Sequence, residues 1–142
     1  MIANIVKGIS DRLYESYDKE QYRVYTEQVK QGFKEPCFFV LLINPTNQSL
    51  LNKQRRRSNT FDIHYFPKNE NDYEDVYTKI DELFEVLEFI EVEGLSKVRG
   101  RGMESEFKNG VLHFFVNYSV FVEKTDDSGN MEDIEINQRV KG

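Results

Sequence analysis

The chain contains 142 residues, of which 39% are hydrophobic and 31% are charged, a composition typical of one globular domain. Its formal net charge of −6 does not favour a nucleic-acid-binding protein, because such proteins gain affinity by neutralising phosphates. The single cysteine, Cys37, excludes an internal disulfide framework and a multi-cysteine zinc site. No apolar run reaches the ~18–20 residues of a membrane span, and the first residues do not resemble a signal peptide. We therefore expect a soluble protein made in the cytoplasm, with one domain over residues 1–124 and an acidic tail over 125–142.

The first half of the chain predicts one helix and three strands. Apolar residues from Ile2 to Tyr17 recur at helical spacing and predict an amphipathic helix that packs on a sheet. Strands are predicted over 22–29 and 37–43, and the second is apolar without interruption, which indicates a central strand covered on both faces. Because this run ends at Asn44-Pro45, residues 44–52 are predicted to form a loop. A further strand is expected over 53–66.

The second half predicts a helix and a long hairpin. Residues 73–87 have clear helical periodicity, with either Asn71 or Asp72 as the N-cap. A short strand over 89–93 precedes a strand over 97–107, in which Gly100 and Gly102 indicate a bulge or a close strand contact. Asn109-Gly110 is a strong hairpin signal, and the returning strand covers 111–123. The tail either adds an edge strand at 131–136 or is mobile.

Together these elements predict an α+β fold, a mostly antiparallel sheet with a long C-terminal hairpin packed by two amphipathic helices.

Few residues suggest chemistry. Cys37 opens an apolar strand without any nucleophile motif, which indicates an inert core thiol. His64 and His113 could meet Asp62 or Asn117 across neighbouring strands and form a small metal or acid–base site. Two histidines alone do not define such a site, so the sequence favours histidines that are hydrogen-bonded or lie at an interface. We therefore expect no catalytic residue, no metal ligand and no cofactor, and a protein that is not an enzyme.

Charge is segregated along the chain. Basic residues gather at 53–57 and 97–101, whereas the helix over 73–87 has an acidic face. A basic run can protect an edge strand, lie in solvent, contact an acidic partner or contact nucleic acid. An acidic helix and a basic strand on one molecule could also join copies head to tail, a geometry that builds rings. The candidate interface residues are Lys53, Arg55, Arg56, Arg57, Arg99, Arg101, Glu82 and Glu85.

Four segments in order carry a resemblance to a known family. They are Lys34-Glu-Pro-Cys-Phe-Phe-Val40, Phe61-Asp-Ile-His-Tyr-Phe-Pro67, Leu83-Phe-Glu-Val-Leu-Glu88 and Gly110-Val-Leu-His-Phe-Phe-Val-Asn-Tyr118. With them the chain resembles the small tail terminator, or tail completion, proteins of phages and prophages of Gram-positive bacteria. The resemblance implies a structural subunit that assembles in the host cytoplasm as a ring, commonly a hexamer. This ring caps the tail tube, ends its polymerisation and becomes part of the virion tail.

The partners implied by this resemblance are other copies of the chain, the tail tube protein and the head–tail connector protein. No membrane is expected, and nucleic acid is not expected as the main partner. The alternative is a small nucleic-acid-binding module that uses the basic clusters at 53–57 and 97–101. A third interpretation is a small enzyme that uses His64 or His113.

Overall fold

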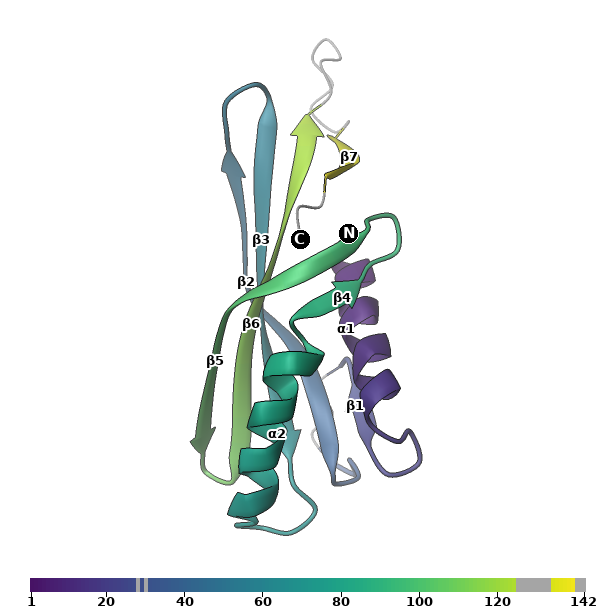
Figure 1. Cartoon of the computed structure of the whole chain (residues 1–142), viewed down its shortest axis with the longest axis vertical. Coiled ribbons are helices and arrows are strands. Elements are labelled where there is room, and N and C mark those ends of the chain that lie inside the picture. Colours follow the sequence, from purple (N-terminus) through teal and green to yellow (C-terminus); the bar gives the residue numbers. More distant parts are fainter. Residues whose placement is uncertain (28, 30, 125–133, 140–142) are drawn as a thin grey trace.

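Two helices and a curled sheet make up the computed structural model of the chain (Figure 1), which describes residues 1–27, 29, 31–124 and the backbone of 134–139. The elements in chain order are α1 (Ile2–Ser16), β1 (Arg23–Tyr25), β2 (Cys37–Ser49), β3 (Gln54–Phe66), α2 (Tyr73–Val86), β4 (Phe89–Glu91), β5 (Lys97–Lys108), β6 (Val111–Lys124) and β7 (Ile134–Arg139). The predicted α+β class is confirmed.

The sheet is mixed, which corrects the expectation of a mostly antiparallel one. Its strand order is β1-β2-β3-β6-β5-β4, and β7 pairs with β6 outside this path. After β1 the chain crosses back to the end of the sheet at which β1 starts, so Arg23 pairs with Cys37 and the two strands run parallel. The other pairs are antiparallel, and the β3–β6 ladder is continuous from Gln54–Glu123 to Tyr65–Leu112.

The predicted loop over 44–52 is wrong, because β2 continues to Ser49 and the turn to β3 is short. Among the described residues, β1 covers only Cys37–Phe39 of β2, which leaves one edge of the strand open beyond that point. Pro45 lies on this open stretch opposite Asn59, and an edge strand tolerates a residue without an N–H. A register shift between Leu42 and Asn44 precedes it. The long β2–β3 hairpin therefore extends well beyond the helices (Figure 1).

Strand β1 is shorter than predicted. It comprises Arg23–Tyr25 rather than 22–29, because only these residues find partners on β2. Positions 28 and 30 of the predicted strand lie outside the described residues. The backbone N–H of Val24 also donates to the Tyr14 hydroxyl, which ties β1 to α1.

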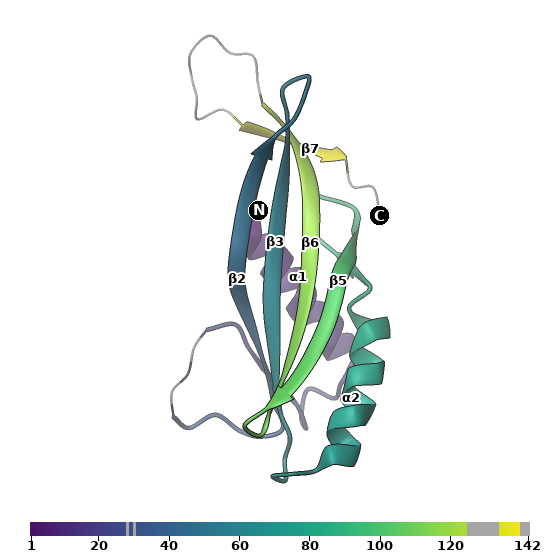
Figure 2. The same cartoon turned by 90° about the vertical axis from the view of Figure 1, so that its left-hand side faces the viewer.

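Both helices cover the same face of the sheet, and Figure 2 shows the opposite face toward the viewer with α1 behind the strands. The buried side of α1 comprises Ile5, Gly8, Ile9 and Leu13. On β6, the inward residues Leu112, Phe114, Val116, Tyr118, Val120 and Val122 are all at most 1% exposed. The alternation predicted for 111–123 thus places one complete side of the strand in the core.

The start of helix α2 and the turn of the β5–β6 hairpin lie where local sequence signals predict them. The N-cap is Asp72 rather than Asn71, since its carboxylate accepts a hydrogen bond from the Asp75 N–H. Asn109 and Gly110 both adopt positive φ, at 54° and 78°, and form the tight turn between β5 and β6.

Strand β7 starts three residues later than the edge strand predicted at 131–136, of which residues 131–133 lie outside the described part. Within the described residues, no helix has the length and apolar character needed to cross a bilayer.

Candidate functional site

The sheet face opposite the helices, here called the outer face, carries the polar residues noted in the sequence. On β3 the inward Phe61, Ile63 and Tyr65 pack in the core, so the alternate residues Asp62 and His64 lie on the outer face. His113 of β6 lies directly opposite His64 in the register. Figure 2 shows this face and the strands that form it.

Asp62 binds both histidines through one carboxylate oxygen. Its Oδ2 lies 2.8 Å from His64 Nε2 and 3.0 Å from His113 Nδ1, and the two rings meet edge to face with centroids 4.3 Å apart. Burial acts to raise the pKa of the Asp62 carboxyl, but the hydrogen bonds to the two histidines outweigh it and hold the pKa below its usual value. The other oxygen, Oδ1, is buried and has no hydrogen-bond partner in the structure.

A hydrogen-bonded network continues along the outer face beyond this cluster. The Asn117 Nδ2 donates to Ser58 Oγ at 2.7 Å and to Thr60 Oγ1 at 2.8 Å. The Ser119 hydroxyl donates to Asn117 Oδ1 at 2.7 Å. These contacts fix the side chains of β3 and β6 relative to one another. Asp62 therefore binds His64 and His113, whereas Asn117 belongs to the neighbouring network.

Aromatic side chains border the cluster at its other end. Phe33, which precedes β2, packs on Phe39 and Phe66 with ring centroids 5.4 and 4.9 Å apart, respectively. Phe66 in turn lies 6.4 Å from the His64 ring. This small apolar group covers part of the outer face and lowers the local dielectric around Asp62, which strengthens the electrostatic interactions there.

The basic residues of 53–57 divide between the two faces of β3. Arg55 and Arg57 pair with Val122 and Val120, which point inward, so both lie on the helix side and are half-buried. Arg56 pairs with Phe121 and is exposed on the outer face. Lys53 lies in the turn at the tip of the β2–β3 hairpin and is exposed.

The second basic cluster, residues 97–101, lies on β5, which is separated from β3 by β6. Arg101 is exposed and pairs with Asn117, so it shares the outer face with Arg56. Arg99 lies 3.8 Å from Glu88 and packs over the Phe89 ring, with the guanidinium 5.9 Å from its centroid. The candidate cations therefore do not all share one face, although Arg56 and Arg101 both lie on the outer face.

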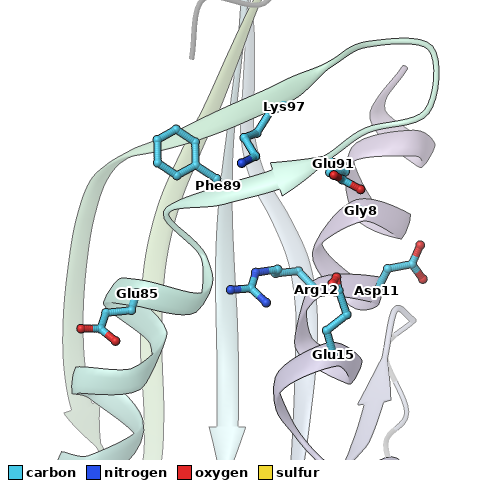
Figure 3. Close-up of a pocket in the computed structure, with 8 residues that line it drawn as sticks. All are labelled: Gly8, Asp11, Arg12, Glu15, Glu85, Phe89, Glu91 and Lys97. Carbon is cyan, nitrogen blue, oxygen red and sulfur yellow. The ribbon is translucent and has the colours of Figure 1, made fainter.

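The acidic residues of α2 differ in their contacts. Glu82 accepts a hydrogen bond from the Tyr17 hydroxyl at 3.0 Å, and it lies 3.9 Å from Lys79 Nζ. Glu82 therefore has an internal role in attaching α2 to α1. Glu85 is exposed and lines a cleft of about 480 Å³ between α1, α2, β4 and β5 (Figure 3).

This cleft carries more negative than positive charge. Four carboxylates line it, those of Asp11, Glu15, Glu85 and Glu91, against the two cations Arg12 and Lys97. In Figure 3, Arg12 reaches from α1 into the space between the helices, below Phe89 and Lys97. The cleft extends the acidic surface of α2 toward the N-terminal helix.

The sequence gives little indication of this cleft, because four separate elements form it. Its one local signal is Gly8, which sits inside a helix where glycine is otherwise unfavourable. A Cβ at this position would lie 2.6 Å from the Glu91 carbonyl oxygen, so glycine allows α1 to approach β4. The outer-face cluster of Asp62, His64 and His113 is easier to anticipate, because all three residues follow strand alternation.

Cys37 has no features of a nucleophile. Its side chain is fully buried, and burial, followed by the charge of Glu35, raises the pKa of its thiol to about 12. Because the thiolate is the reactive form of cysteine, this buried, protonated thiol is unreactive at neutral pH.

A comparison with protein-family models identifies the chain. The model described as phage tail terminator protein matches residues 4–130, which is most of the sequence. No curated protein sequence matches the chain. The matched residues include most of α1, all of α2 and strands β1 to β6. The chain therefore belongs to the phage tail terminator protein family, a family of structural components of the phage tail rather than of enzymes.

Proposed function

We propose that the chain assembles into a ring that caps the finished tail tube, ends its polymerisation and presents the surface that joins tail to head. The observation that carries this proposal is the family match over residues 4–130. A six-fold ring, assembled in the host cytoplasm and incorporated into the virion tail, is the form that the sequence resemblance implies. Copies of this chain, the tube protein and the connector protein are the proposed partners.

The placement of charge supports contact between copies. Arg56 and Arg101 are exposed on the outer face beside Glu104 and Glu106, and Glu85 and the acidic cleft lie on the helix side. Exposed cations on one side of a subunit and carboxylates on the other favour a heterologous, head-to-tail contact, and such contacts close into rings when the rotation permits.

Exposed apolar side chains lie at two positions suited to such a contact. Leu51 is 87% exposed at the tip of the β2–β3 hairpin, next to Leu50. Tyr73, Tyr77 and Phe84 are exposed on α2 among its carboxylates. We propose that the hairpin of one subunit contacts the α2 side of the next, since a hydrophobic centre with a charged rim is typical of protein interfaces.

Polymerisation of the tube protein tests this function directly. The tube protein of the same phage is assembled with and without the purified full-length chain, and tube lengths and ends are examined by negative-stain electron microscopy. We expect rings at tube ends and shorter tubes as the chain is added. Tubes of unchanged length without bound protein would contradict the proposal.

A DNA titration at two salt concentrations separates this proposal from the nucleic-acid alternative. A ring-forming tail protein should show no tight, steeply salt-dependent DNA binding. Such binding, combined with no effect on tubes, would favour the basic clusters as a nucleic-acid surface.

A further inference from the structure

The Asp62, His64 and His113 side chains form a preorganised set of metal ligands on the outer face. Their ligand atoms, one oxygen and two imidazole nitrogens, all lie within 4.8 Å of one another. They come from two adjacent strands whose register is continuous over this region. We propose that these three residues bind one divalent transition-metal ion of the zinc class, with further coordination positions directed away from the sheet.

The donor set selects the class of metal. Two imidazoles and one carboxylate are ligands that Zn²⁺ and its neighbours accept, and three-residue sites of this type leave a position for water or another ligand. Ca²⁺ and Mg²⁺ prefer oxygen ligands and would not gain from His64 and His113.

Metal binding requires a rotation of the two imidazole rings. Zinc bonds of roughly 2.0–2.1 Å place tetrahedral ligand atoms about 3.3 Å apart. The two N···O separations at Asp62 Oδ2 are 2.8 and 3.0 Å, so they must widen by a few tenths of an ångström as the ion replaces the bridging protons. The two imidazole nitrogens, which lie within 4.8 Å of each other, must approach by up to about 1.5 Å. The histidine side chains are 21% and 27% exposed, which leaves them free to make this adjustment and leaves the ion a path from solvent.

Three further observations favour a cation here. The Asp62 Oδ1 is buried without a hydrogen-bond partner, so the metal-free carboxylate is only partly compensated. Glu106 of β5 lies directly opposite His113, on the same face, and supplies a second negative charge near the cluster. Phe66 and Phe39 shield one side of the cluster, where a lower dielectric strengthens the attraction between the carboxylate and the ion.

Competition with a zinc-binding dye, on the full-length chain without a histidine tag, tests the site. The chain contains only two histidines, and the one cysteine is buried, so histidine-dependent binding maps to this site. We expect one Zn²⁺ per chain and no competition by Mg²⁺. At one equivalent of Zn²⁺, the ring resonances of both histidines should shift together in NMR spectra.

Matched variants localise the ion. His64→Gln and His113→Gln should each weaken Zn²⁺ binding by more than the roughly 10–100-fold that loss of an outer-shell partner costs. Glu104→Gln, which changes an exposed carboxylate in the register row of Asp62 but two strands away from it, should leave the affinity unchanged. Circular dichroism verifies that each variant folds.

Absence of saturable Zn²⁺ binding by the wild-type chain would overturn the inference, whatever the variants do. Equal affinity of the wild-type chain and the folded histidine variants would also overturn it. The measurement uses the isolated chain, so a failed metal site leaves the proposed tail function intact, and the reverse also holds.

Discussion

Gly100 shows how one residue sets the approach of β5 to the end of α2. Its N–H donates to the Glu88 carbonyl at 2.6 Å, and a Cβ built on it would lie 2.6 Å from the Leu87 carbonyl oxygen. The same Cβ would lie 2.8 Å from a methyl carbon of Val116. The Leu87 carbonyl also accepts a hydrogen bond from the buried Tyr118 hydroxyl. The Leu87 carbonyl is therefore held in place, and a side chain at position 100 has little space between this carbonyl and Val116.

Gly100→Ala should lower the free energy of unfolding by about 1–3 kcal/mol, because overpacking forces backbone or side chains to shift. Urea denaturation measures the change. Ser105→Ala, at an exposed position on the same strand, is the control and should stay within about 0.5 kcal/mol of the wild type. Equal stability of the two variants would show that β5 can move away from Leu87 without cost.

At the scale of elements, a buried ammonium group attaches α2 to its surroundings. Lys79 is 5% exposed, its Nζ lies 2.9 Å from Asp75 Oδ1, and the rings of Tyr17, Tyr22 and Tyr65 lie within 5.2–5.6 Å of it. Burial acts to lower the pKa of Lys79, but the hydrogen bond to Asp75 and other contacts outweigh it and raise the pKa above its usual value. The charged form is thus the native one.

Removing the anion should cost more than removing the cation. Asp75→Ala leaves the Lys79 ammonium buried without its main partner, and we expect a loss of roughly 2–4 kcal/mol in unfolding free energy. Lys79→Met replaces the ammonium with an apolar chain of similar volume and should change stability by less than about 1 kcal/mol. Urea denaturation of both variants decides the order. A larger loss for Lys79→Met would contradict this account of the pair.

Because of the tyrosines near Lys79, we expect the folded protein to lose stability in alkali. Burial and the hydrogen bond to Asp75 raise the pKa of Tyr65, and burial and the charge of Glu82 raise that of Tyr17. The unfolded chain therefore loses these protons at lower pH than the folded one. Their contribution is complete below pH ~10 and declines as pH rises further.

Urea denaturation between pH 8 and 11 tests this pH dependence, and Tyr65→Phe should show a shallower decline than the wild type. Stability that stays constant or rises above pH 10 would contradict it.

Local signals explain which elements could be predicted. Helix α2 has its own cap and periodicity, and the Asn109-Gly110 turn needs only its two residues, so both are found from sequence. The extension of β2 through Pro45 depends on pairing with β3, and the parallel β1 pair depends on a distant partner. At the site, alternation placed Asp62 and His64 on one face, but only the β3–β6 register brings His113 opposite His64. The acidic cleft was not foreseeable, because it joins four elements.

At the scale of the whole molecule, charges of both signs are exposed on both sides of the sheet. The outer face presents Arg56 and Arg101 together with Glu104 and Glu106, and the helix side presents Glu85 and the acidic cleft. The net charge of −6 is therefore not a uniform acidic coat, because exposed cations lie among the carboxylates. If copies join head to tail, a charge on one side acts on the neighbouring subunit rather than on its own fold.

Arg56→Glu should impair ring formation on tubes while leaving unfolding free energy within about 0.5 kcal/mol of the wild type, because Arg56 is exposed. Negative-stain microscopy of tube ends measures the first effect, and urea denaturation measures the second. Lys68→Glu, an exposed reversal between β3 and α2, is the control and should cap normally. Equal capping by both variants would show that Arg56 lies in solvent in the assembly.

The central claim is that this chain terminates the phage tail, and deletion of its gene tests this most directly. Electron microscopy of lysates compares tube lengths and head attachment in the deletion and in the same phage supplied with the wild-type chain. We predict tubes of irregular, excessive length without heads in the deletion, and normal headed virions after complementation. Tails of normal length joined to heads in the absence of the chain would contradict the account.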